Sequence, residues 1–213
     1  NALYALKGQM VNKETLANQA AEIEIDILKR NMGKQDHYAA AYGGMNIITF
    51  NQDETVKVDP VICDHYSLKA LQENLLLFFT GNTRDASKIL KSQTEKTEDK
   101  FETLIKMRNL VPALKKAIEV DDHDTFGSLL HKNWLLKKSI TNDISSKNID
   151  KCYQEALDGG AIGGKLLGAG GGGFLCFYVN KENHKNVIKN MSDLYNLNFQ
   201  FENIGTQITY YDQ

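Results

Sequence analysis

The sequence predicts an α+β protein made of two domains. Helical segments are indicated over 13–30 and over much of 94–138, where apolar residues recur every three or four positions. Short strands are indicated where β-branched, aromatic and leucine residues form runs of four to six, bounded by turn residues, as in 75–79 and 174–179. Because strands and helices alternate without a repeat or heptad pattern, a globular fold is expected rather than a fibrous one.

Length and composition limit the classes of function. The 213 residues are 42% hydrophobic and 24% charged, which is ordinary for a chain that buries a core. The formal charge of −2 and the lack of a basic cluster indicate that nucleic acid is not a partner. The longest apolar runs are far shorter than the roughly 20 residues that span a bilayer. No membrane association is expected, and the oligomeric state is not indicated.

The cysteines and the N-terminal end add two expectations. Cys63, Cys152 and Cys176 are too few and too scattered for a disulfide framework or a zinc site, which favours a cytoplasmic location. Residues 1–6 are helical in composition but have neither an initiator Met nor a capping residue before them. An upstream part of the protein is therefore expected to be missing.

The first predicted helix carries a buried carboxylate. Within 13–30, Leu16, Ala20, Ile23 and Ile27 recur at helical spacing, and Asn12 can cap the start. At about 100° per residue, Glu24 lies on the same apolar face. A carboxylate at such a position needs a partner.

A glycine-containing loop and a hairpin complete the predicted first domain. Residues 31–44 place glycines around the polar cluster 34–37, and this segment is predicted to be a loop. Residues 45–50 and 55–58 are predicted to pair as strands. Pro60 and the polar stretch up to Ser67 mark the domain boundary, so that the predicted domains are 1–66 and 67–213.

The second domain begins with a strand that is apolar on both faces, residues 75–79, followed by a turn-rich exit. Pro112 is expected to break the long helical region. The remaining expected elements are helices over 86–91, 149–157 and 182–194 and strands over 161–167, 174–179, 198–201 and 207–211.

The glycine run 168–173 satisfies G-x-G-x-x-G, but its context differs from that of a dinucleotide-binding fingerprint. A strand follows it instead of a helix, and no Lys-Ser or Lys-Thr closes it as in a P-loop. A plain hairpin turn needs only one or two glycines. Five glycines around one alanine favour a loop whose bare N–H groups approach an anion or a second loop, with a simple turn as the alternative.

Residues 164–173 resemble the third signature motif of the GHMP kinases, the superfamily of galactokinase, homoserine, mevalonate and phosphomevalonate kinases. Residues 33–44 resemble the segment with the catalytic aspartate, in the form typical of D-glycero-D-manno-heptose 7-phosphate kinases, and 79–84 and 129–137 are similar to stretches of that branch. The resemblance implies the end of an S5-like N-terminal domain followed by a ferredoxin-like C-terminal domain. It also implies that the first motif and the main phosphate loop precede residue 1, so that this fragment alone is expected to be inactive.

The resemblance implies roles for individual residues. Asp36 would accept or orient the proton of the acceptor hydroxyl, with an Asx turn as the structural alternative. Glu24 would bind Mg²⁺, with a buried Glu–Lys pair as the alternative. The loop residues Gly168, Ala169, Gly170 and Gly171 would back the phosphates. Arg84 follows a strand end, and its planar guanidinium suits a phosphate or sugar hydroxyls, with an ordinary surface arginine as the alternative. Lys34 is a further candidate for binding substrate. Weaker candidates are Lys88, His131, Trp134 and Lys137, and His37 is expected only to line the site.

The function implied by the resemblance is ATP- and Mg²⁺-dependent phosphorylation of the anomeric hydroxyl of a sugar phosphate, with D-glycero-D-manno-heptose 7-phosphate, giving the 1,7-bisphosphate, as the expected acceptor. The alternatives are a fucokinase-like or galactokinase-like sugar 1-kinase and, more distantly, the mevalonate branch. The rival class is a catalytically silent regulator that binds sugar or nucleotide. The presence of both Glu24 and Asp36 argues against that class.

Overall fold

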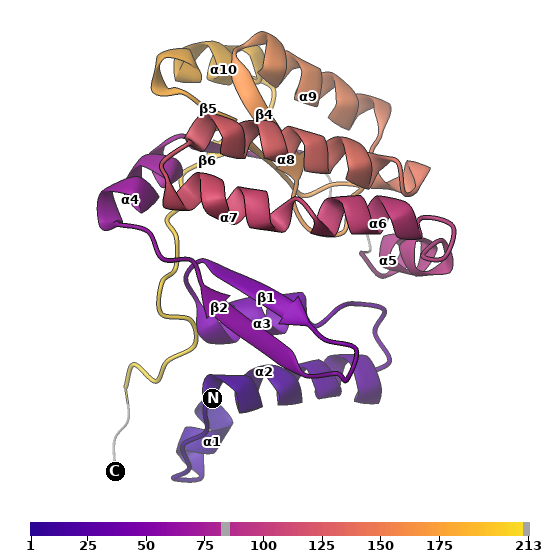
Figure 1. Cartoon of the computed structure of the whole chain (residues 1–213), viewed down its shortest axis with the longest axis vertical. Coiled ribbons are helices and arrows are strands. Elements are labelled where there is room, and N and C mark those ends of the chain that lie inside the picture. The colour runs from indigo at the N-terminus through magenta and orange to yellow at the C-terminus, as the bar shows by residue number, and fades with distance from the viewer. Residues whose placement is uncertain (82–85, 211–213) are drawn as a thin grey trace. The chain divides into compact units, whose positions relative to one another are not determined.

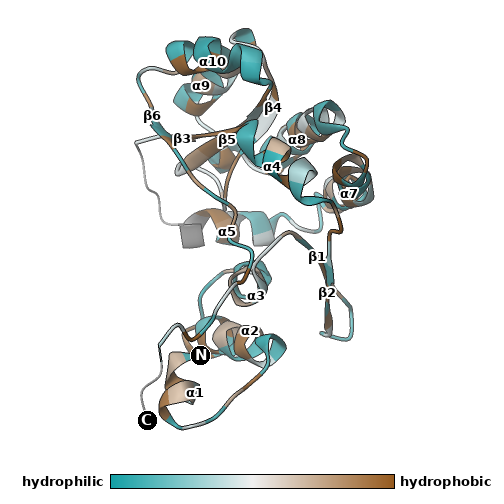
Figure 2. Ribbon diagram, turned by 90° about the vertical axis from the view of Figure 1, so that its left-hand side faces the viewer, coloured by the Kyte–Doolittle hydropathy of each residue, from teal (hydrophilic) through white to brown (hydrophobic). Residues whose placement is uncertain are grey.

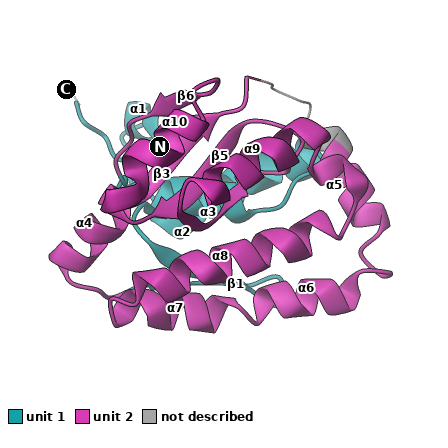
Figure 3. Ribbon diagram, turned by 90° about the horizontal axis from the view of Figure 1, so that it is seen from above, with its two compact units in different colours: residues 1–61, 201–213 teal, residues 62–200 magenta. Residues whose placement is uncertain are grey.

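The computed structural model describes residues 1–81 and 86–210 and divides the chain into two compact units (Figure 3). Unit 1 comprises Asn1–Val61 and the chain from Phe201 onward, and unit 2 comprises Ile62–Gln200. This differs from the two continuous stretches, 1–66 and 67–213, expected from the sequence. The C-terminal chain belongs to unit 1 because the Gly44 N–H donates to the Glu202 carbonyl at 2.6 Å and Lys13 Nζ donates to the Ile204 carbonyl.

Unit 1 is built from short helices and one hairpin (Figure 1). The Asn12 side chain accepts a hydrogen bond from the Thr15 N–H, as expected for a helix cap. The predicted hairpin is confirmed as an antiparallel pair. The elements are α1 (Ala2–Leu6), α2 (Lys13–Ala21), the π-helical η1 (Glu22–Ile27), α3 (Gln35–Tyr42), β1 (Asn46–Phe50) and β2 (Val56–Pro60).

Two predictions for this unit are wrong. Residues 31–44 are not one loop, because α3 occupies most of the segment. The predicted apolar face of the first helix is not the buried one either: Ile23 is 50% and Ile27 65% exposed, whereas Ala17 is fully buried. A small side chain at that position lets α2 approach Tyr38 of α3 closely, and both residues belong to the core of this unit.

Unit 2 contains a four-stranded antiparallel sheet of order β4-β5-β3-β6 with helices packed around it (Figure 1). Pro112 lies in the first turn of α7, so the predicted break at this proline is confirmed. The elements are α4 (His65–Glu73), β3 (Leu75–Phe79), α5 (Ala86–Glu95), α6 (Phe101–Arg108), α7 (Val111–Glu119), α8 (His123–Lys138), η2 (Asn142–Ile144), α9 (Lys147–Asp158), β4 (Ala161–Leu166), β5 (Phe174–Val179), η3 (Lys181–Asn183), α10 (His184–Asn190) and β6 (Tyr195–Leu197).

The two faces of this sheet are covered by different helices. Consecutive residues of β5 point to opposite faces, and Tyr178 contacts Phe126 of α8 whereas Phe177 contacts Tyr153 of α9. The central strands β3 and β5 are the apolar part of the sheet in Figure 2, in agreement with the buried core around Phe78 and Phe177. The α+β fold class is therefore confirmed.

The C-terminal strands were predicted in the wrong places. The last strand of the sheet is β6, which ends at Leu197, and no strand forms over 198–201 or 207–210 in the structure as described. After β6 the chain does not extend the sheet. It continues in unit 1, where the Glu202 carbonyl accepts a hydrogen bond from the Gly44 N–H. Of the helices described here, none combines the length and the apolar character needed to cross a membrane.

Candidate functional site

A pocket of about 390 Å³ in unit 1 brings two carboxylates together. Glu24 of η1 and Asp36 of α3 both line it, although they are 12 positions apart in the sequence. The remaining lining residues are apolar or uncharged apart from one imidazole: Asn1, Leu16, Ala20, His37, Ala40, Ala41 and Thr206. The predicted helix face with Leu16, Ala20 and Glu24 is thus a pocket wall rather than a core surface.

Both oxygens of Glu24 have partners. Arg30 donates from NH1 to Oε1 at 2.7 Å, and His37 Nε2 lies 2.9 Å from Oε2. The Glu24 side chain is 31% exposed and lines the pocket, while Arg30 and His37 hold the orientation of its carboxylate. The sequence analysis considered a buried ion pair with lysine as the alternative role of Glu24, whereas its partners in the structure are an arginine and a histidine.

Asp36 lies in the first turn of α3 and not in a loop. Its side chain is exposed, and within the described residues it forms neither a hydrogen bond nor an ion pair, including the Asx-turn bond considered above. The positive end of the helix dipole favours a negative charge at this position. The carboxylate is thus available to a ligand in the pocket.

His37 is buried and contacts the first of these two acids, Glu24. In the tautomer with the proton on Nε2, the ring donates to Glu24, which leaves Nδ1 as an acceptor. Nδ1 is buried and has no hydrogen-bond partner among the residues that the structure describes. His37 fixes the orientation of Glu24, which is more than the lining role expected from the sequence.

The donor set of this pocket suits Mg²⁺ only when a ligand supplies phosphate oxygens. No group of three or more His, Cys, Asp or Glu side chains that could hold a metal occurs in the described ranges. Magnesium is commonly bound through one or two carboxylates together with substrate phosphates. Glu24 and Asp36 fit that requirement, whereas they do not form an all-protein metal cage.

Of the two predicted substrate-binding cations, only Lys34 lies within the described residues, and it pairs with an acid away from this pocket. Lys34 Nζ donates to Glu54 Oε2 at 2.6 Å, and this hydrogen bond raises the pKa of Lys34. Lys34 is not among the residues that line the pocket with Asp36. Arg84 and the side chain of Lys88 lie outside the described residues.

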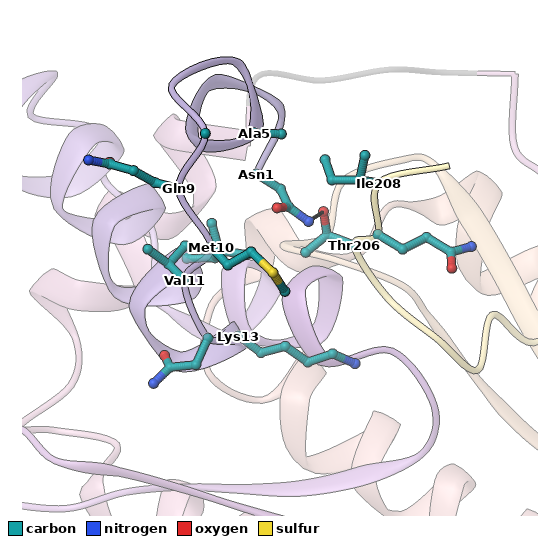
Figure 4. Close-up of a pocket in the computed structure, with 12 residues that line it drawn as sticks. Asn1, Ala5, Gln9, Met10, Val11, Lys13, Thr206 and Ile208 are labelled. Carbon is teal, nitrogen blue, oxygen red and sulfur yellow. Dashed lines mark hydrogen bonds between the residues drawn. The ribbon is translucent and has the colours of Figure 1, made fainter. Parts of the chain in front are cut away.

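A second, larger pocket of about 860 Å³ also lies in unit 1 (Figure 4). Its wall combines the turn between α1 and α2 with the C-terminal chain, including Met10, Lys13 and Ile208. Asn1 Nδ2 donates to Thr206 Oγ1 at 3.3 Å, so that these two segments are joined at one edge. Asn1, Leu16 and Thr206 line both pockets, which are therefore neighbours.

The glycine loop of unit 2 adopts backbone conformations that other residues rarely take. Gly168, Gly170, Gly171 and Gly173 have φ values of 70°, 120°, 75° and 101°. A Cβ atom on Gly170 would lie 2.9 Å from the Cα atom of Ile144 in η2. Part of the glycine requirement therefore comes from close packing against a second loop, one of the two reasons considered from the sequence.

Two side chains hold the carbonyl groups of this loop. Lys137 Nζ donates to the Gly168 carbonyl, and Gln93 Nε2 donates to the Ala169 carbonyl at 2.9 Å. The described peptide bonds are trans, so the N–H groups of Ala169 and Gly170 point away from these side chains. Neither N–H makes a backbone hydrogen bond within the described part of the chain. They are available to an acceptor.

A pair of lysines beside this loop was only partly recognised from the sequence. Burial, followed by the charge of Lys165, lowers the pKa of Lys137 to about 8. Burial also lowers the pKa of Lys165, which contacts Asn133 Oδ1 at 3.4 Å. Lys137 was a weak candidate and Lys165 was considered only as part of a motif, because a spacing of 28 positions does not reveal that the two residues meet.

The other weak candidates have structural partners. The Tyr153 hydroxyl donates to the Gly164 carbonyl, accepts from the Gly164 N–H and lies 2.8 Å from His131 Nδ1. Burial raises the pKa of Tyr153. Trp134 is fully buried in the core of unit 2. These residues fix α8, α9 and β4 to one another.

Comparison with known proteins identifies the second unit. Residues 110–197 match the family profile described as "GHMP kinases C terminal". These residues are a GHMP kinase C-terminal domain. Within this domain the glycine loop joins β4 to β5, the position that the third GHMP motif was expected to occupy. The motif and the family profile therefore agree on the same segment.

Relatives of the GHMP kinase family extend the similarity over both units. The chain is 34% identical over 176 residues, 82% of its length, to the D-glycero-alpha-D-manno-heptose 7-phosphate kinase of Campylobacter jejuni. It also resembles the crystal structure of a D-glycero-D-manno-heptose 1-phosphate kinase from Bacteroides thetaiotaomicron, with 25% identity and a TM-score of 0.67 over 98% of the chain. The chain spans 52% and 60% of the lengths of these two proteins.

A more distant similarity extends to another branch of the family and concerns the fold alone. The phosphomevalonate kinase of Streptococcus pneumoniae, solved in complex with phosphomevalonate and AMPPNP, is 15% identical and gives a TM-score of 0.72. The match covers 90% of this chain and 61% of that protein.

Proposed function

We propose that this chain forms part of an ATP-dependent kinase that phosphorylates the anomeric hydroxyl of a sugar phosphate. The observation that carries the proposal is the shared pocket of Glu24 and Asp36, two acids for which the family resemblance implies metal-binding and catalytic roles. The heptose kinases named above support a sugar phosphate as the acceptor. D-glycero-D-manno-heptose 7-phosphate is the proposed acceptor, and the 1,7-bisphosphate is the product.

In the proposed reaction, Asp36 acts on the acceptor hydroxyl. Its carboxylate accepts the hydroxyl proton while the sugar oxygen forms a bond to the γ-phosphorus of ATP. The bond between that phosphorus and the β,γ-bridging oxygen breaks, and ADP leaves with the electron pair. Asp36 then releases the proton to solvent, to which it is exposed. A base of this kind contributes about 10²–10⁴ to the rate.

Glu24 is the proposed protein ligand for the Mg²⁺ ion of Mg-ATP. The ion, when bound, neutralises charge on the transferring phosphoryl group. Arg30 and His37 hold the two oxygens of Glu24 in a fixed direction, which lowers the entropy lost when the carboxylate binds an ion. The carboxylate oxygens each keep further lone pairs for that purpose.

The proposed role of Gly168, Ala169, Gly170 and Gly171 is to support phosphate groups. The outward N–H groups of Ala169 and Gly170 are suitable donors for phosphate oxygens because the loop carbonyls are already held on the other side. Lys34 is proposed to bind substrate only after its ion pair with Glu54 opens, and that pair is exposed on the Glu54 side.

Asp36→Asn in the complete gene product tests this function. We expect the turnover rate for heptose 7-phosphate, followed by ADP release, to fall by about 10²–10⁴, because the amide cannot accept the proton. Nucleotide affinity should stay within about twofold, since the substitution keeps the shape of the side chain. The matched control is Asp26→Asn, which changes an exposed carboxylate of η1 outside the pocket. Wild-type turnover in Asp36→Asn would remove Asp36 from its role.

A further inference from the structure

Two lysines lie beside the start of the glycine loop. Lys165 is near the end of β4, and Lys137 is near the end of α8, which covers this face of the sheet. We propose that Lys137 and Lys165 together bind the phosphate group of a substrate on this side of unit 2. The inference rests on the proposed kinase function, because that function supplies two phosphate-bearing ligands, a sugar phosphate and a nucleotide. Lys137 was only a weaker candidate from the sequence, and Lys165 had no role of its own within the 164–173 motif.

Strand register explains why the two lysines meet. Lys165 is paired with Cys176 across the antiparallel strands β4 and β5, so that both residues point to the same face of the sheet. That face carries α8, because Tyr178 two residues beyond Cys176 contacts Phe126 of this helix. Asn133 and Lys137 are one helical turn apart on α8. Lys165 contacts Asn133 and is close enough to Lys137 to affect its pKa.

Within the described ranges, no acidic side chain compensates the positive charge of this pair. Neither Lys137 nor Lys165 has a carboxylate oxygen within 4.0 Å among the residues described. Both side chains are half-buried, and two like charges in a partly desolvated site repel each other. Burial is the main cause that lowers the pKa of both lysines, and the charge of Lys165 lowers the pKa of Lys137 further. A doubly charged anion between them would remove the unfavourable term.

The lysines also retain donors and space for a ligand. Each ammonium group has three N–H donors, and one is used by Lys137 toward Gly168 and one by Lys165 toward Asn133. No atom lies within 4 Å of the position that a Cβ of Gly168 would occupy, so there is open space beside the loop. The Gly168 carbonyl, which would otherwise repel an anion, is already bonded to Lys137.

A purely structural role explains one lysine but not two. Lys137 could serve only to hold the Gly168 carbonyl, as Gln93 holds that of Ala169 without any charge. Lys165 adds electrostatic repulsion toward Lys137, and its hydrogen bond goes to Asn133 and not to the loop. An anion-binding role explains why both are present.

The test measures binding of inorganic phosphate, mannose 6-phosphate and ADP to the 213-residue chain by calorimetry at constant ionic strength. A charge-assisted hydrogen bond is worth about 1.5–3 kcal/mol, so Lys137→Met and Lys165→Met should each weaken phosphate binding about tenfold or more. Lys132→Met is the matched control, because Lys132 is an exposed lysine of the same helix, and it should leave the affinity within about twofold.

The three probes distinguish the source of the phosphate. Loss of mannose 6-phosphate binding alone in the two Met variants assigns the site to the phosphate of the acceptor, and loss of ADP binding alone assigns it to the nucleotide. Lys137→Arg and Lys165→Arg keep the charge and should restore most of the phosphate affinity, which separates a charge effect from misfolding. Wild-type phosphate affinity in Lys165→Met, or no saturable phosphate binding by the wild-type chain, would overturn the proposal.

Failure of this proposal and failure of the proposed function are distinguishable. Asp36→Asn should bind phosphate like the wild type, because the Asp36 side chain forms no hydrogen bond or ion pair with Lys137 or Lys165 among the described residues. If the complete gene product shows no turnover but the lysine-dependent phosphate binding remains, only the proposed function fails. If turnover and KM are unchanged in the two Met variants, only the lysine site fails.

Discussion

Lys137→Met should make unit 2 more stable near neutral pH and remove part of its pH dependence. The pKa of Lys137 lies at about 8 in the folded chain, against an ordinary lysine value of 10.5. Between these two values the unfolded chain holds more protons than the folded one, so the free energy of unfolding rises with pH in this interval. Below about pH 8 the folded protein carries the full cost of the charged ammonium.

The size of this effect follows from the same values. The difference between about 8 and 10.5 corresponds to about 3 kcal/mol at most. Methionine removes that cost but also removes the hydrogen bond to the Gly168 carbonyl, which is worth about 1–2 kcal/mol. A net gain of about 1–2 kcal/mol is therefore expected at pH 7. It should fall as pH rises and become a net loss of about 1–2 kcal/mol above about pH 10.5, where only the lost hydrogen bond remains.

The measurement is urea unfolding of the wild type and Lys137→Met at several pH values between 7 and about 10.5. Trp134 is the only tryptophan and is fully buried in unit 2, so its fluorescence reports on this unit. Thiols whose pKa is raised by burial also titrate in this range, including Cys176 with a pKa of about 11. They are common to both proteins and cancel in the difference. Equal pH slopes for the two proteins would refute the reasoning, and Lys132→Met should keep the wild-type slope.

Three further substitutions test the glycine loop and the strand that precedes it. Gly170→Ala should destabilise unit 2 by about 1–3 kcal/mol, because φ is 120° and the new Cβ would lie 2.9 Å from a backbone carbon. Gly168→Ala should cost less, about 1 kcal/mol, since its φ is 70° and no atom is within 4 Å. Equal losses in the two variants, by urea unfolding, would contradict the packing argument. Tyr153→Phe should cost about 1–3 kcal/mol because it leaves both backbone groups of Gly164 without their partner, and an unchanged unfolding midpoint would contradict this.

Local patterns predicted the elements whose structure depends on nearby residues. Leu75–Phe79 is a strand as predicted, although only alternate residues are buried, so that it is not buried on both faces. The hairpin of β1 and β2 forms where alternation and turn residues placed it. The helix α3 was missed because glycines and the polar cluster 34–37 resemble a loop, whereas packing of Tyr38 and Ala41 against α2 stabilises a helix there. Predictions at the C-terminal end failed because strand pairing there depends on distant partners.

The candidate site was predictable only in part. Helical spacing placed Glu24 on one face with Leu16 and Ala20, and this face lines the pocket instead of being buried. The partners Arg30 and His37 were not predicted, because they lie beyond a π-helical segment that shifts the register of the side chains. Asp36 was identified through the family resemblance and not through its chemistry. The contact between Lys137 and Lys165 depends on strand register, which no spacing in the sequence specifies.

The two unfavourable features of unit 2 occur at the same place. A run of glycines costs backbone entropy on folding, and a pair of uncompensated, half-buried lysines costs solvation and repulsion. Single substitutions could remove individual glycines of the run or the charge of either lysine. Local rules of stability are broken at functional sites more than elsewhere, since a ligand supplies the missing interactions. Because both features adjoin Gly168, the phosphate ligand that we propose would account for the lysine pair and for the part of the glycine requirement that packing against Ile144 does not explain.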